Sequence, residues 1–148
     1  MNGRPVHFLL VEDDDDHAEL ISLSLLAEDS IRKTVDRVRD GSEALAYLIN
    51  EGAYKDRPRP QVVLLDLKLN KNGGIEGQEV LAAMKSDPDL RNTPVVVLTS
   101  SHTPAAKLTA YTHRANSYLC KPVDFSEFDR LIKAVARYWG GLNYTPGR

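Results

Sequence analysis

The chain has 148 residues and nearly balances 19 basic against 21 acidic side chains, which excludes a strongly basic face for nucleic acid. Its one cysteine, Cys120, excludes a disulfide framework, and no apolar run approaches the roughly 20 residues of a membrane helix. The N-terminus also lacks the layout of a signal peptide. We therefore expect one cytoplasmic domain over residues 1–148, with no nucleic-acid or membrane partner. Cys120 itself is expected to be a small buried hydrophobe.

Strand and helix patterns alternate five times along the chain. The predicted strands cover residues 6–11, 34–38, 61–66, 95–98 and 117–120. In the third, the residues from Val62 to Leu65 are apolar without alternation, which is typical of a strand buried on both faces. The second strand is more polar and suits a sheet edge. Strands that alternate with helices predict an α/β fold, in which helices cover both faces of a five-stranded parallel sheet.

The first helix follows the acidic stretch at residues 12–16 and runs to about Asp29. Its apolar positions at three- and four-residue spacing form one stripe of Ala18, Ile21 and Leu25. Leu20 and Leu23 lie on a second side of this helix. We expect them to pack on another helix, the alternative being exposure to a partner.

The next three helices are marked by their ends. The second begins at Asp40, an N-cap with a Glu three residues later that can return the bond. Its expected buried face consists of Ala44, Leu45, Leu48 and Ile49. The third ends before residues 87–88, because a residue that precedes proline disfavours the helical conformation. The fourth covers about residues 104–114, with Thr103 as N-cap and a proline at its first position.

The last helix has a strict amphipathic pattern. Its apolar residues recur at three- and four-residue spacing and are expected in the core: Phe125, Phe128, Ile132, Val135 and Trp139. The glycine pair at 140–141 is expected to end this helix. The domain core therefore covers about residues 5–140. Residues 141–148 form a tail, in which Leu142 and Tyr144 are the apolar anchors.

Polar residues stand at the carboxyl ends of four predicted strands. They are Glu12 and Asp13, Asp66, Thr99 and Lys121. Because right-handed crossovers bring the carboxyl ends of parallel strands to one edge, we expect these side chains to meet there. Three close carboxylates repel one another unless a cation lies among them, and Mg2+ prefers such oxygen ligands. The set therefore predicts phosphoryl transfer to the Asp66 carboxylate, with Lys121 and Thr99 bonding the phosphoryl oxygens.

Four short motifs mark these strand ends. They are Leu-Leu-Val-Glu-Asp at 9–13, Val-Leu-Leu-Asp at 63–66, Val-Leu-Thr-Ser at 97–100 and Tyr-Leu-Cys-Lys-Pro at 118–122. Each motif alone is weak, but in this order they resemble the receiver domains of two-component response regulators over about residues 5–140. The resemblance implies the (βα)5, flavodoxin-like receiver fold and a phosphoacceptor signalling role. It also implies that the protein is no enzyme, beyond taking part in its own phosphotransfer and dephosphorylation.

The resemblance assigns roles at the acidic strand ends. Asp66 is implied as the phosphoacceptor, Asp13 as a direct Mg2+ ligand, and Glu12 as a ligand acting through water. Lys68 would offer its backbone carbonyl to the metal, so its side chain need not matter. The acids at residues 14–16 are expected only to complement the dipole of the first helix.

The resemblance also implies a switch near the other strand ends. Thr99 would be the switch hydroxyl, and Tyr118 the aromatic that swings inward as Thr99 moves, the alternative being a packed aromatic. The bond between Lys121 and Pro122 is similar to one that is cis in the family, an isomer accessible before proline. One departure is Asn70, which stands where the family usually has proline, in a loop that is a few residues longer. It leaves the loop conformation and the phosphate lifetime open.

Among receivers, the resemblance is greatest to the stand-alone regulators that partner phytochrome-type sensor histidine kinases. It rests on residues 39–45, 80–91 and 94–98. It implies such a kinase as phosphoryl donor and a homodimer through the fourth helix, the fifth strand and the fifth helix. The signal would leave by a phosphorylation-dependent change of surface, toward a protein target that the sequence does not identify.

Three other functions fit less well. A phosphatase that forms an aspartyl phosphate usually needs an Asp two residues after the nucleophile, where this chain has Lys68. A silent scaffold has no need of the pocket residues. A flavin-binding domain needs a phosphate loop after the first strand, where this chain has acids. The histidines show no metal-ligand spacing and are expected to be ordinary residues: His7, His17, His102 and His113.

Overall fold

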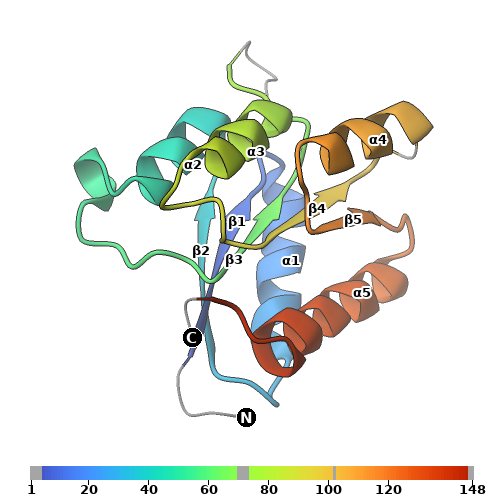
Figure 1. Cartoon of the computed structure of the whole chain (residues 1–148). Coiled ribbons are helices and arrows are strands. Elements are labelled where there is room, and N and C mark those ends of the chain that lie inside the picture. The colour runs from blue at the N-terminus through green and yellow to red at the C-terminus, as the bar shows by residue number, and fades with distance from the viewer. Residues whose placement is uncertain (1–4, 70–73, 102, 147–148) are drawn as a thin grey trace.

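The structure is a computed structural model that describes residues 5–69, 74–101 and 103–146 (Figure 1). Five parallel strands form one sheet in the order β2-β1-β3-β4-β5. The strands are β1 Val6–Val11, β2 Lys33–Val38, β3 Val62–Leu65, β4 Val95–Thr99 and β5 Ser117–Cys120. The predicted fold class is confirmed, and every strand begins and ends within one residue of its predicted bounds.

Helices connect the strands. They are α1 Asp15–Ala27, α2 Gly41–Leu48, α3 Gly77–Ser86, α4 Pro104–Thr112 and α5 Phe125–Arg137. A short 3-10 helix, η1 Gly52–Tyr54, precedes β3, and a π-helical turn, η2 Tyr138–Leu142, follows α5. The predicted N-caps are confirmed, since Asp40 accepts a bond from the N–H of Glu43 and Thr103 accepts one from that of Ala106. No helix within the described residues has the length and apolar character needed to cross a membrane.

The strand order reverses beside β1. This strand pairs with β2 from Val6 opposite Lys33, and with β3 from Phe8 opposite Val62. The chain therefore leaves β1 toward one edge of the sheet and returns on its other side. In open α/β sheets such a reversal opens a crevice at the carboxyl ends of the two central strands, where ligands bind.

Two apolar cores lie on the two faces of the sheet. One holds Leu9 and Val11 of β1 with the buried residues of α2, α3 and α4, and the other holds Phe8 and Leu10 with those of α1 and α5. Figure 1 shows the same division of the helices between the two faces. Alternate residues of each strand thus face opposite cores, which explains why these strands read as continuous apolar runs.

Two predictions about α1 and α2 need correction. Leu23 is 60% exposed instead of packed, whereas Leu20 does pack on the core beneath α1. In α2 the expected Ile49 is exposed and Tyr47 is buried. Ile49 is the C-cap, where the backbone has left the helical conformation. Tyr47 can be buried because its hydroxyl donates to Asp36 and contacts the imidazole of His7.

The C-terminal segment also differs from the prediction. Phe125 is exposed at the first position of α5, whereas Phe128 and Ile132 are buried as expected. The glycines at 140–141 do not end the helical segment but lie inside η2. A side chain at Gly140 would meet Ile31 at 2.3 Å, so glycine is required there by close packing. The expected anchors Leu142 and Tyr144 are both exposed.

Two further expectations concern β5 and the residue after it. Cys120 is half-buried, not fully buried, and its thiol lies 3.7 Å from the carbonyl oxygen of Ser101. The peptide bond between Lys121 and Pro122 is trans, not cis. Trans is the more stable isomer before proline by about 0.5–1 kcal/mol. With this trans bond Lys121 still reaches Glu12 and Asp66 at the carboxyl edge of the sheet. The predicted effect of Asn70 lies outside the described residues.

Candidate functional site

The backbones of β1 and β3 bring the acidic residues together. The N–H of Asp66 donates to the carbonyl of Val11 at 3.0 Å, and the N–H of Glu12 donates to that of Val38 at 3.1 Å. Both residues thus continue the ladder of the parallel sheet by one bond beyond the strands. Their side chains emerge at the crevice where the strand order reverses.

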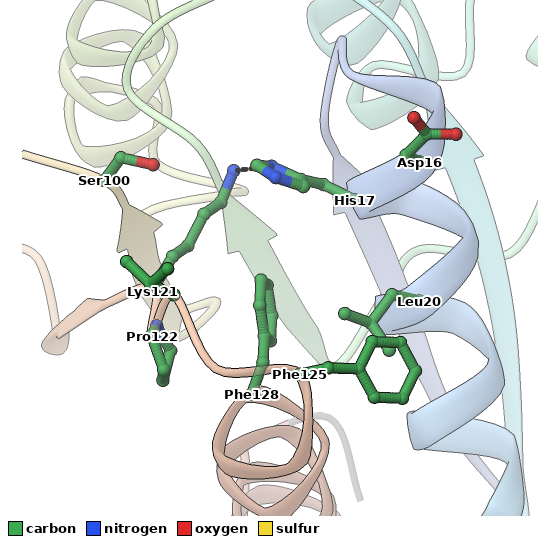
Figure 2. A pocket seen from close by; sticks show the side chains of 9 residues that line it. Asp16, His17, Leu20, Ser100, Lys121, Pro122, Phe125 and Phe128 are labelled. Carbon is green, nitrogen blue, oxygen red and sulfur yellow. Dashed lines mark hydrogen bonds between the residues drawn. The ribbon is translucent and has the colours of Figure 1, made fainter.

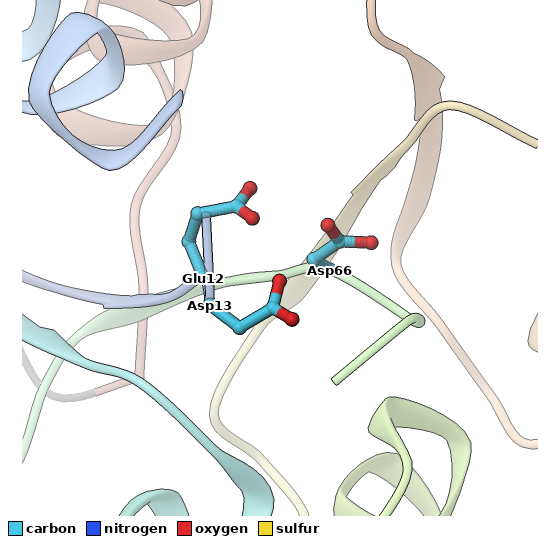
Figure 3. A group of neighbouring side chains, drawn as sticks. All are labelled: Glu12, Asp13 and Asp66. Atoms are coloured by element: carbon cyan, nitrogen blue, oxygen red, sulfur yellow. The ribbon is translucent and has the colours of Figure 1, made fainter. Parts of the chain in front are cut away.

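Glu12, Asp13 and Asp66 form one acidic cluster at this crevice (Figure 3). One carboxylate oxygen of each lies within 4.8 Å of those of the other two. Glu12 is 1% exposed and Asp66 7% exposed, while Asp13 is half-buried. Because these side chains are largely shielded from water, their charges are screened weakly. The three carboxylates therefore repel one another strongly when all are ionised.

Lys121 places a buried positive charge beside this cluster. Its ammonium lies 2.6 Å from Oε1 of Glu12 and 2.9 Å from Oδ2 of Asp66. Lys121 itself is only 6% exposed. Although burial opposes the charged form, the carboxylates of Asp66 and Glu12 outweigh it and raise the pKa of Lys121. The ammonium therefore remains charged inside the site.

Glu12 carries the clearest sign of excess negative charge. Burial, together with the negative charge of Asp66, raises the pKa of Glu12 from 4.5 to about 7, against the opposing effect of Lys121. Independently of this shift, three carboxylates beside one ammonium leave the site with a net negative charge when all are ionised. A hard divalent cation would supply what is missing, and the all-oxygen composition of the cluster fits such a cation. The site therefore has the chemistry of a divalent-metal site.

Both carboxylate oxygens of Asp66 have donors. The backbone N–H of Lys68 donates to Oδ1 at 3.1 Å, and Lys121 donates to Oδ2. The turn that follows β3 thus fixes the direction of this side chain. The resemblance assigned the backbone carbonyl of Lys68 to the metal. The bond to Asp66 uses the N–H of the same residue, so the carbonyl role stays a prediction.

Thr99 and Tyr118 meet the same segment after β4. Thr99 is fully buried, and its hydroxyl accepts a bond from the N–H of Ser101 at 3.3 Å. Tyr118 is half-buried, and its hydroxyl donates to the carbonyl of Ser101 at 2.8 Å. The two predicted switch residues are therefore linked through Ser101. A rearrangement of this segment would move both.

His17 belongs to the site and was missed by the sequence analysis. Its Nδ1 lies 2.9 Å from the ammonium of Lys121. The sequence offered one indication of this role. His17 falls in the first turn of a helix that starts at the ligand-binding edge of the sheet. Of the neighbouring acids, Asp14 caps α1 and Asp15 binds Arg37 and Arg39, while their expected effect on the helix dipole stays a prediction.

The fold and the site together define a class of protein. A doubly wound parallel sheet with an acidic cluster and a buried lysine at its switch point is the arrangement of a phosphoacceptor domain. Comparison with known proteins agrees, because the response regulator receiver domain matches residues 8–135 of this chain. The chain belongs to the response regulator receiver domain family, whose function is phosphoacceptor signalling.

Individual relatives are similar over nearly the whole chain. The probable methanogenesis regulatory protein FilR2 of Methanothrix harundinacea is 40% identical over 97% of this chain and 89% of its own length. The response regulator Rcp1 of Synechocystis is 36% identical over 91% of this chain and 89% of its own length. The expected likeness to phytochrome response regulators is confirmed by the solved structure of RcpA.

Solved structures give the same picture. The phosphorylated cyanobacterial phytochrome response regulator RcpA has a TM-score of 0.90 at 37% identity, over 97% of this chain and 99% of that one. The Mn2+-bound form of Rcp1 has a TM-score of 0.89 at 35% identity, over 96% and 99% of the two chains. The predicted receiver fold is confirmed by these structures.

Proposed function

We propose that Asp66 accepts a phosphoryl group from a sensor histidine kinase and that the protein signals through the resulting change of surface. The observation that carries this proposal is the position of Asp66 between a buried ammonium and two further carboxylates. Each oxygen of Asp66 already has one donor, which holds the carboxylate in a single orientation. A carboxylate held in one orientation beside a phosphate-binding lysine is a suitable nucleophile for phosphoryl transfer.

The acidic cluster would hold Mg2+. Asp13 and Asp66 would bind it through carboxylate oxygens, Glu12 through a water molecule, and Lys68 through its backbone carbonyl. When bound, Mg2+ neutralises charge on the cluster and on the phosphoryl oxygens. The composition of the site supports this assignment, because three carboxylates lie beside a single buried ammonium.

The chain's own residues then perform three tasks. Asp66 forms a new P–O bond as the P–N bond to the kinase histidine breaks, and the released imidazole takes up a proton. Lys121, held between Asp66 and Glu12, donates to a phosphoryl oxygen. Thr99 turns its hydroxyl toward the phosphoryl group and gives up its bond to Ser101, which frees Tyr118 to move inward. Later attack of water on phosphorus restores the Asp66 carboxylate.

The partners follow from the relatives and from the surface. Similarity to RcpA and Rcp1 supports a phytochrome-type kinase as the phosphoryl donor. Leu108 and Tyr111 of α4 are 68% and 49% exposed, which supports a homodimer through α4, β5 and α5. In this proposal the switching unit covers about residues 5–140, residues 141–148 form a tail, and the protein acts in the cytoplasm.

Phosphotransfer from a histidine kinase tests the proposal. Wild-type protein and Asp66→Asn are each mixed with autophosphorylated kinase and Mg2+, and intact-mass spectrometry follows the added phosphoryl group. We expect transfer to the wild type and none to Asp66→Asn, because an amide oxygen is a poor nucleophile. Asp16→Asn is a matched control, since Asp16 is an exposed acid in the first turn of α1. Equal transfer to Asp66→Asn would reject the assignment.

A further inference from the structure

The ammonium of Lys121 has three acceptors in this structure, which come from three different elements. They are Oε1 of Glu12 after β1, Oδ2 of Asp66 after β3, and Nδ1 of His17 in α1. An ammonium has three N–H donors and no acceptor, so each of these contacts is a bond that Lys121 donates. The Nδ1 of His17 must therefore carry a lone pair, which assigns its ring proton to Nε2 in the neutral imidazole.

His17 is held in place at its backbone and at its ring. In α1 its backbone N–H donates to the capping carboxylate of Asp14 at 3.0 Å. Across the helix interface its ring packs edge-to-face on Phe128 of α5, with a centroid distance of 5.9 Å. Figure 2 shows the imidazole and the ammonium of Lys121 pointing toward each other, where both line a pocket of about 470 Å³. The acceptor is thus presented by a fixed side chain.

We propose that His17 is a positioning residue for Lys121. By accepting the third N–H, it keeps the ammonium from giving all three donors to Glu12 and Asp66. The neutral imidazole is a weaker acceptor than either carboxylate. The N–H that Lys121 donates to His17 is therefore the first that can turn to a phosphoryl oxygen. His17 therefore keeps one donor of Lys121 in reserve for the incoming group. The inference rests on the proposed function of Asp66 and Lys121.

Two substitutions separate the acceptor from the ring. His17→Asn keeps an acceptor oxygen at the same number of bonds from the backbone as Nδ1, but it loses the ring. His17→Phe keeps an aromatic ring against Phe128, but it has no acceptor. We expect His17→Phe to be phosphorylated by acetyl phosphate and Mg2+ at least about fivefold more slowly than wild type, and His17→Asn within about twofold of it.

A second histidine provides the control. His113 lies at the C-cap of α4, and its imidazole bonds a backbone carbonyl of that helix. His113→Phe should be phosphorylated at the wild-type rate, and urea unfolding shows whether each variant is folded. A normal rate in His17→Phe would overturn the inference. Equal slowing in His17→Asn and His17→Phe would overturn it too, because the ring and not the acceptor would then be responsible.

A spectroscopic measurement examines the contact without phosphorylation. In protein labelled with 15N-histidine, Nδ1 of His17 should show the shift of an unprotonated, hydrogen-bonded nitrogen at neutral pH. This resonance should move in Lys121→Met. A protonated Nδ1, or no change in Lys121→Met, would overturn the inference. If the expected resonance is found while the wild type takes up no phosphoryl group, the proposed function fails and the contact is only structural.

Discussion

Gly77, the first residue of α3, lies directly against the backbone of Asp66. A Cβ atom added to Gly77 would lie 2.2 Å from the carbonyl oxygen of Asp66 and 2.5 Å from Cα of Leu67. The N–H of Gly77 also donates to the carbonyl of Leu67 at 3.0 Å. The start of α3 is therefore packed onto the turn that presents the Asp66 carboxylate. Only glycine permits so close an approach.

Gly77→Ala should affect both stability and phosphorylation. The added methyl group must displace backbone and not a flexible side chain, so we expect the free energy of unfolding to fall by about 1–3 kcal/mol. Phosphorylation by acetyl phosphate should slow as well, because the Asp66 turn moves. Gly74→Ala is the matched control, since among the residues that the structure describes no heavy atom lies within 4 Å of its Cβ position. Indistinguishable urea midpoints for the two variants would contradict this packing.

The pH dependence of stability should reveal Glu12. The pKa of Glu12 is about 7 in the folded state and near its ordinary value of 4.5 in the unfolded state. The folded state therefore holds the Glu12 proton more tightly. The contribution of Glu12 to the free energy of unfolding is therefore fully present below pH 4.5, and it is lost as pH rises to about 7. The loss should be on the order of 3 kcal/mol without metal.

Glu12→Gln removes this titration. Urea unfolding in EDTA at several pH values between 4.5 and 8 should show the wild type losing stability relative to Glu12→Gln across that window. The variant keeps Lys121 paired with Asp66, so a buried pair remains and no lone charge is created. Parallel curves for the two proteins would show that the pKa of Glu12 is not raised.

Metal binding should depend on the acidic cluster and not on the acids of α1 in general. Asp13→Asn is expected to weaken Mg2+ binding at least about tenfold, because it replaces a charged oxygen ligand by a neutral one. Asp16→Asn should bind as the wild type does, since Asp16 is exposed outside the cluster. Calorimetric titration at pH 8 gives both affinities. Equal weakening in the two variants would point to a general charge effect.

Tyr47 should stabilise the sheet at its other end. Its hydroxyl donates to Asp36 at 2.5 Å and lies 2.6 Å from Nε2 of the buried His7. Tyr47→Phe leaves His7 without this partner, so we expect a loss of about 1–3 kcal/mol in the free energy of unfolding. Tyr111→Phe, at a half-exposed position of α4, should change it little. Thermal unfolding of both variants provides the comparison, and equal melting temperatures would contradict it.

The strands and most of the site were predictable because each depends on local pattern and topology. Buried parallel strands are apolar along their whole length, and the polar residue that ends each one is conspicuous. Asp66 and Lys121 could therefore be placed at one edge of the sheet from crossover handedness alone. The contact itself, 2.9 Å from the ammonium of Lys121 to Oδ2 of Asp66 across the intervening β4, is known only from the structure.

The residues that were missed depend on partners far away in the chain. His17 contacts Lys121 across 104 positions, and Tyr47 is buried because of hydroxyl bonds to residues of β1 and β2. Gly140 resembles a helix stop in the sequence, yet it fits close against Ile31. Periodicity describes one element at a time, so it cannot anticipate contacts that only the assembled layers create.

Chemical trapping of the phosphorylated carboxylate tests the central claim most directly. Protein treated with acetyl phosphate and Mg2+ is reduced with borohydride, which converts an acyl phosphate to an alcohol, and peptide mass spectrometry then locates the altered residue. We predict homoserine at Asp66 alone, with Glu12 and Asp13 unchanged and no product when EDTA is present. Reduction at Glu12 or Asp13, or at no residue of the acidic cluster, would contradict this account of the site.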